Sequence, residues 1–82
     1  MELTQLKVEL LAVLDSGFRD QASPITYREV ERKIENLTDQ WDHILKTIKE
    51  IRLVIRLFVD ESLADDVYKE LLTVAEAATQ PR

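Results

Sequence analysis

Apolar residues recur at alternating intervals of four and three along residues 30–58, and this repeat constrains the fold more than any other feature. The series runs through Val30, Ile34, Leu37, Trp41, Ile44, Ile48, Ile51, Ile55 and Phe58. A mean spacing of 3.5 residues is typical of a helix packed against other helices, whereas a half-buried β-strand alternates every second residue. The repeat therefore predicts a long helix over residues 27–60.

The residues just before the repeat indicate where this helix begins. Thr26 and Glu29 have the spacing of a capping box, in which each side chain bonds the backbone amide of the other residue. Ile25 and Val30 bracket the pair as a hydrophobic staple. We therefore expect the first helical residue to be Tyr27.

The predicted length of this helix raises a packing problem. At about 1.5 Å per residue it would be about 50 Å long, whereas a compact domain of this size is only about 30 Å across. Either the helix breaks at residues 36–39, with Thr38 or Asp39 as a new cap, or it overhangs and a second copy covers it. Because the repeat continues through Leu37 and Trp41, we expect the second arrangement.

A shorter helix is predicted before the loop at residues 19–24. Its apolar face over residues 2–16 consists of Leu3, Leu6, Leu10, Val13 and Leu14. Gly17 is expected to end it in a left-handed conformation, with Phe18 folding back on Val13.

A last helix is predicted over residues 62–78, beginning at Asp60 or at Ser62, which forms a possible capping box with Asp65. Its inward face would be Ala64, Val67, Leu71, Val74 and Ala78. Residues 79–82 are expected to fray. The sequence thus predicts one all-α domain, a three-helix hairpin or bundle built around one long central helix and completed by dimerisation.

Net charge and composition exclude several classes of protein. A net charge of −5 argues against general nucleic-acid binding, which relies on clustered Lys and Arg. The absence of cysteine excludes disulfides and thiolate metal sites. No apolar run approaches the roughly 18–20 residues of a membrane span, and the first residues lack the basic start of a signal peptide. We expect a cytoplasmic protein without a membrane span.

Charge is unevenly distributed along the chain. Residues 43–58 contain four basic residues and one acidic residue, whereas residues 60–76 contain six acidic residues and one basic residue. We expect the acidic segment to fold back on the basic one. The rival interpretation is an anionic ligand held by Arg52 and Arg56.

The repeat also indicates candidate binding surfaces. Leu53 and Leu57 fall on positions of the helix that face away from the row of repeating apolar residues. Apolar residues also occupy positions beside that row, which suggests that the helix contacts more than one other helix. The predicted partner or self-association surface consists of Ile34, Trp41, Ile48, Leu53, Val54, Leu57 and Phe58.

Catalytic motifs are absent from the sequence. His43 is the only histidine, and together with Asp39 it provides too few ligands for a metal site. We therefore predict no catalytic, cofactor or metal residues, and favour a non-enzymatic protein–protein interaction module such as an adaptor, assembly subunit or regulator. The alternatives are a small bundle that binds and acts on an anion or divalent metal, and an inhibitory or immunity-type protein with an acidic face.

Overall fold

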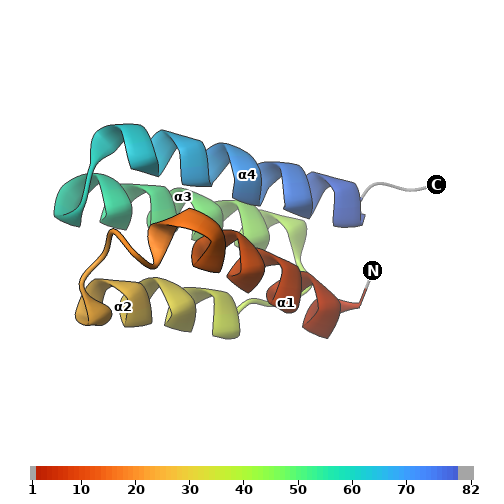
Figure 1. The fold of residues 1–82 in the computed structure, drawn as a ribbon. Coiled ribbons are helices and arrows are strands. Elements are labelled where there is room, and N and C mark those ends of the chain that lie inside the picture. Colours follow the sequence, from red (N-terminus) through yellow and green to blue (C-terminus); the bar gives the residue numbers. More distant parts are fainter. Residues whose placement is uncertain (1, 80–82) are drawn as a thin grey trace.

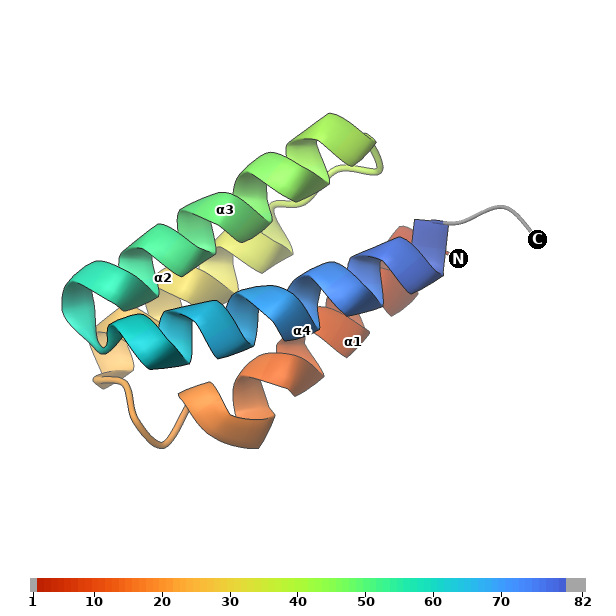
Figure 2. The same ribbon diagram turned by 90° about the horizontal axis from the view of Figure 1, so that it is seen from above.

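The computed structural model describes residues 2–79, and within this range the chain is all-helical, as predicted, without strands. The elements are α1 (Leu3–Val13), a π-helical turn η1 (Leu14–Phe18), α2 (Pro24–Glu35), α3 (Trp41–Phe58) and α4 (Glu61–Thr79). Successive helices run in opposite directions (Figure 1). α1 and α3 each pack against both α2 and α4, so the four helices close into a bundle of 36 × 21 × 20 Å (Figure 2).

The prediction of one long helix over residues 27–60 is wrong. This segment forms two antiparallel helices, α2 and α3, joined by residues 36–40. Leu37 in the connection is nevertheless buried, so the apolar repeat continues through a segment that is not helical. Because α2 folds back and covers α3, a second copy is not needed to cover an overhang, and the bundle has four helices in place of the expected three.

The connection between α2 and α3 is held by polar contacts that differ from the expected cap. The residue before α3 is Gln40, whose side chain makes no capping hydrogen bond. The amide of Thr38 donates to Nδ1 of His43 at 3.2 Å, and the amide of Gln40 donates to Oγ1 of Thr38 at 3.4 Å. His43 therefore stabilises the turn at residues 36–40, where the apolar repeat predicted a continuous helix.

α2 begins three residues earlier than predicted. Ser23 is its cap, accepting a hydrogen bond from the amide of Thr26 at 3.2 Å, and Pro24 occupies the first helical position, where a missing amide proton costs nothing. The capping box of Thr26 with Glu29 is therefore wrong. The staple is wrong as well, since Ile25 is largely exposed.

A π-helical turn, and not a left-handed glycine, ends the first helix. The amide of Arg19 donates to the carbonyl oxygen of Leu14, five residues earlier, at 3.0 Å, and Gly17 has no positive φ. The wider turn buries Phe18 completely, in line with Leu6, Leu10 and Leu14.

The last helix begins at Glu61, in agreement with the first of the two predicted starts, Asp60. The carboxylate of Asp60 accepts a hydrogen bond from the amide of Leu63 at 2.9 Å, so Asp60 is the cap and the box of Ser62 with Asp65 is not used. Ala64, Val67 and Leu71 are buried as predicted, and Val74 and Ala78 are partly buried. Thr79 still belongs to α4, and the rest of the predicted frayed tail lies outside the described residues.

Candidate functional site: an apolar patch on α2 and α3

Five apolar side chains lie at the end of the bundle where α2 begins and α3 ends. We call them the apolar patch: Ile25, Leu53, Val54, Leu57 and Phe58. The exposed fractions are 84% for Ile25, 71% for Phe58, 67% for Leu57 and 53% for Leu53, and Val54 is half-buried. A group of exposed large apolar side chains on a small protein is a candidate interaction site.

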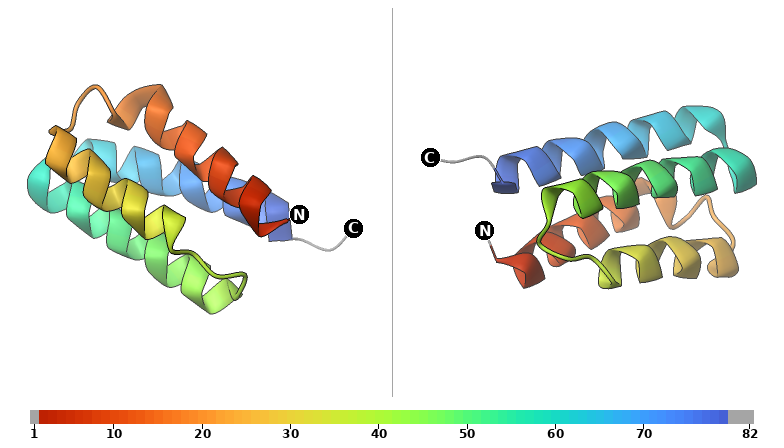
Figure 3. Two further views of the ribbon diagram at one scale, coloured as in Figure 1. Left: turned by 90° about the horizontal axis from the view of Figure 1, so that it is seen from below. Right: turned by 180° about the vertical axis from the view of Figure 1, so that it is seen from behind.

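Helix geometry explains why the patch is left uncovered. Ile51 and Ile55 are buried, and at about 100° per residue Leu53 and Leu57 point away from them toward solvent. α3 lies between α2 and α4 (Figure 3, right), which leaves this outward side of α3 without a neighbouring helix. Val54 and Phe58 lean toward α2 and line an open hollow together with Ile25.

The structure brings together only part of the predicted surface. Leu53, Val54, Leu57 and Phe58, four of the seven residues predicted for this surface, meet in the patch. Ile34 and Ile48 are buried by the chain itself. Trp41 is the first residue of α3, at the end of that helix farthest from the patch. Its side chain is 36% exposed, so it does not belong to the buried core. Ile25 was missed as a surface residue, since it was assigned to the staple.

Charged residues lie beyond both ends of the patch, on α3 and at the start of α4. Lys46 and Lys49 are exposed, precede it, and form no ion pair with any residue between 2 and 78. Glu61 follows the patch, is exposed, and makes only a long 3.8 Å contact with Arg56. Basic side chains therefore precede the patch on α3, and at its other end the acidic Glu61 of α4 lies beside the basic Arg56.

Arg52 and Arg56 are engaged by acidic residues of α4. Nε and Nη2 of Arg52 lie 3.0 and 2.8 Å from Oδ1 of Asp65, and its guanidinium lies 5.0 Å from the ring centroid of Tyr68. Arg56 pairs with Glu61 as described above. The acidic segment thus folds back on the basic one, as predicted, and the guanidinium of Arg52 already has an anionic partner.

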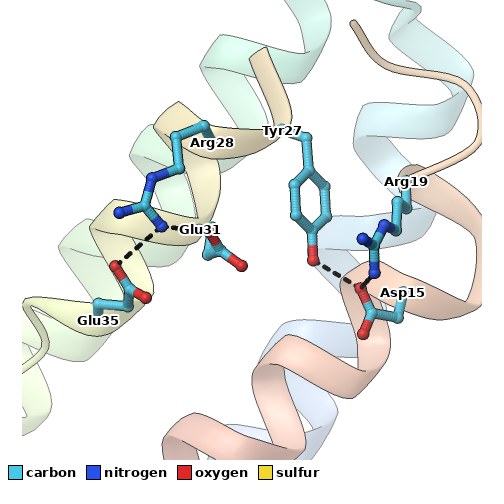
Figure 4. A network of polar contacts seen from close by, with 6 residues as sticks. All are labelled: Asp15, Arg19, Tyr27, Arg28, Glu31 and Glu35. Atoms are coloured by element: carbon cyan, nitrogen blue, oxygen red, sulfur yellow. Dashed lines mark hydrogen bonds and ion pairs between the residues drawn. The ribbon is translucent and has the colours of Figure 1, made fainter. Parts of the chain in front are cut away.

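A separate polar cluster joins the π-helical turn to α2 (Figure 4). The hydroxyl of Tyr27 donates to Oδ1 of Asp15 at 2.6 Å, Arg19 lies 3.5 Å from the same oxygen, and the ring of Tyr27 stacks on Phe18 with centroids 6.0 Å apart. Burial of the phenol, followed by its hydrogen bond to Asp15, raises the pKa of Tyr27 to about 12. A phenol held protonated in this way is a structural link between the π-helical turn and α2.

A second polar group lies along α2 in the same view. Arg28 bonds Glu31 and lies 3.5 Å from Glu35, and its pKa is raised first by the hydrogen bond to Glu31. These residues are three and seven positions apart on one helix, so they stabilise α2 along its exposed side.

Two further findings concern metal and membrane sites. Between residues 2 and 79 there is no group of three or more His, Asp or Glu side chains that could hold a metal ion. Over the same range no helix is both long and apolar enough to cross a membrane.

Comparison of the chain with protein-family models, curated proteins and solved structures found no match. We therefore infer its function from the chemistry of its own surface.

Proposed function

We propose that this chain is a non-enzymatic helical interaction module that binds another protein chain through the apolar patch. The observation that carries this proposal is the exposure of Ile25, Leu53, Leu57 and Phe58 at one end of the bundle. Fully burying a side chain of this size contributes about 1.5–3 kcal/mol, and most of that contribution is not realised within one chain. A partner that covers the patch would recover it.

The shape of the patch favours a helical partner over a small ligand. Leu53 and Leu57 are one turn apart, as are Val54 and Phe58, so they form the i, i+4 rows with which helices pack into one another. The hollow beside Ile25 is open to solvent and has an apolar floor. Small-molecule sites are concave and enclose most of their ligand, which this surface does not.

The experiment is site-specific crosslinking in cells of the source organism. A photoreactive amino acid replaces Leu57 in one variant and Val8 in the control, because Val8 is also apolar and about half exposed but lies on α1. We expect a defined adduct from position 57 that is absent from position 8. The adduct should disappear when Leu53→Ser is added, while the far-ultraviolet circular dichroism of that variant stays helical.

Two results would oppose the proposal. Absence of a protein adduct at position 57 would leave the patch without a partner. Equal adducts from positions 57 and 8 would show that exposure alone, and not the patch, determines the reaction.

A further inference from the structure

We infer that the partner of the apolar patch is an acidic amphipathic helix of a different protein. Its apolar side chains cover the patch, and its carboxylates lie against the basic residues that precede the patch on α3. This inference rests on the proposed function and specifies the chemistry of the partner. It is carried by the charge of the exposed side of α3, which continues the patch toward the start of that helix.

The side chains that point away from the buried isoleucines of α3 form one strip. At about 100° per residue, the strip follows the helix for about three turns. We call it the outer face of α3, and all of its residues are exposed: Lys46, Lys49, Leu53, Arg56 and Leu57. The two lysines come first along the helix and the two leucines follow. A single helix that lies along the outer face therefore meets lysines at one end and leucines at the other.

Two shallow hollows show how apolar and basic side chains combine on the outer face. One is lined by Lys49, Arg52, Leu53 and Arg56. Three cationic groups thus stand beside one leucine. The other hollow shares Lys49 and Leu53 with the first, extends toward the start of α3, and is also lined by Lys46. Both arrangements suit a partner that carries a carboxylate and a large apolar side chain about one turn apart on the same side of a helix.

The lysines of the outer face form no ion pair within residues 2–78. Asp42 and Glu50 lie one turn before and one turn after Lys46 and line the same hollow, but neither is paired with it. Arg56 makes one long contact with α4, at 3.8 Å. Residues 46–57 contain four basic residues and one acidic residue, although the net charge of the chain is −5. The outer face is therefore a locally basic surface on an acidic protein.

Acidic side chains border the outer face on both sides. Glu50 precedes Val54 by one turn, on the edge of α3 toward α2. On the opposite edge Asp65 of α4 is bonded to Arg52. The basic strip is therefore about as wide as one helix. A flat anionic surface such as a lipid membrane would meet these carboxylates as well as the lysines, whereas a helix about 10–12 Å in diameter meets mainly the strip.

The chain itself does not offer such a helix. Its most acidic helix is α4, with five acidic residues and one lysine. Within the described residues the exposed large apolar side chains lie on α1, α2 and α3, and none lies on α4. The acidic surface of a second copy could pair with the lysines but could not cover the leucines. The combination of both therefore points to a different protein.

Two synthetic helices test the charge of the partner. Both peptides carry two leucines one turn apart on one side. On the same side, in the preceding turns, one peptide carries two glutamates and the other carries two lysines. We expect the full chain to bind the acidic peptide at least about tenfold more tightly than the basic one. Fluorescence anisotropy measures both affinities.

Charge reversal on α3 tests which residues select the peptide. Lys46→Glu with Lys49→Glu should weaken binding of the acidic peptide about tenfold and strengthen binding of the basic one. Arg32→Glu with Lys69→Glu is the matched control, because it changes the net charge equally at exposed positions of α2 and α4, and should leave both affinities unchanged. Leu53→Ser should weaken both peptides. Circular dichroism first shows that each variant is folded.

Equal affinity for the two peptides, or failure of the acidic peptide to bind, would overturn the inference. So would a dimer of this chain that Leu53→Ser dissociates, since a second copy would then occupy the patch. Tighter binding to vesicles that contain phosphatidylserine than to the acidic peptide would also overturn it. If position 57 still forms its specific adduct with another protein in any of these cases, the interaction module stands and only the acidic helix is excluded. If no adduct forms either, both proposals fail.

Discussion

The contrast between Ile55 and Phe58 provides the sharpest test of the fold. Both belong to the same apolar repeat, three residues apart, but Ile55 is fully buried and Phe58 is 71% exposed. Ile55→Ala should therefore lower the free energy of unfolding by about 2–5 kcal/mol, the range for a cavity left in a packed core. This corresponds to a drop in Tm of about 10 °C or more for a domain of this size.

Phe58→Ala should cost less, although phenylalanine is the larger side chain. Less than a third of its surface of about 200 Å² is covered, which gives about 60 Å², or about 1.5 kcal/mol at about 25 cal/mol per Å². Alanine recovers about 0.5 kcal/mol through its higher helix propensity, so the net cost is about 1 kcal/mol.

The measurement is urea denaturation followed by circular dichroism, at protein concentrations low enough that association does not contribute to stability. Leu57→Ala is the control, because Leu57 is also exposed and lies next to Phe58 in the last turn of α3. A cost for Phe58→Ala equal to that for Ile55→Ala would refute the arrangement, since it would mean that Phe58 is enclosed and the patch does not exist.

Three further predictions follow from the helix ends and the polar cluster. Gly17→Ala should raise the free energy of unfolding by about 0.5–1 kcal/mol in urea denaturation, because Gly17 has no positive φ and an added Cβ meets no atom within 4 Å. Asp60→Ala should lower it by about 1 kcal/mol through loss of the α4 cap, and Asp60→Asn should keep most of the stability. In a Tyr68→Phe background the phenolate absorbance of Tyr27 should titrate near pH 12, and Asp15→Asn should move that midpoint toward 10. Because folding raises this pKa, the stabilisation from Tyr27 is complete below pH 10 and is lost as the pH rises toward 12, which denaturation at alkaline pH should show.

The buried faces of the helices could be predicted because the spacing of apolar residues indicates which side of a helix packs against the core. Ile44, Ile48, Ile51 and Ile55 are all buried, and they are set by side-chain spacing alone. The contact between Arg52 and α4 could be predicted for a similar reason, since opposite charges occur in successive segments of one short chain.

The break between α2 and α3 could not be predicted from the repeat. Leu37 is buried in the connection, so the apolar spacing is the same whether the chain is helical there or turns. The choice depends on what the rest of the chain can cover, and folding back allows α2 to bury Val30 and Ile34 against the bundle.

The start of α2 was misplaced because two cap candidates stand three residues apart. Ser23 and Thr26 both carry a suitable hydroxyl, and Pro24 distinguishes them, since proline suits the first helical position. The exposure of Ile25 and Phe58 depends on this start. The last turn of α3 is covered or exposed according to where α2 begins. The apolar periodicity within α3 carries no information about the start of α2.

We expect the π-helical turn to let the first helix lose one residue without losing its core contacts. Its hydrogen bonds span five residues, where those of an α-helix span four. Deleting Gly17 would leave Phe18 three positions after Leu14, which is the same side of a regular α-helix, so the ring would still reach the core. A one-residue deletion within α3 would instead rotate every later side chain by about 100° and move Ile55 away from the core. A one-residue deletion should therefore be accepted in the π-helical turn far more readily than within α3.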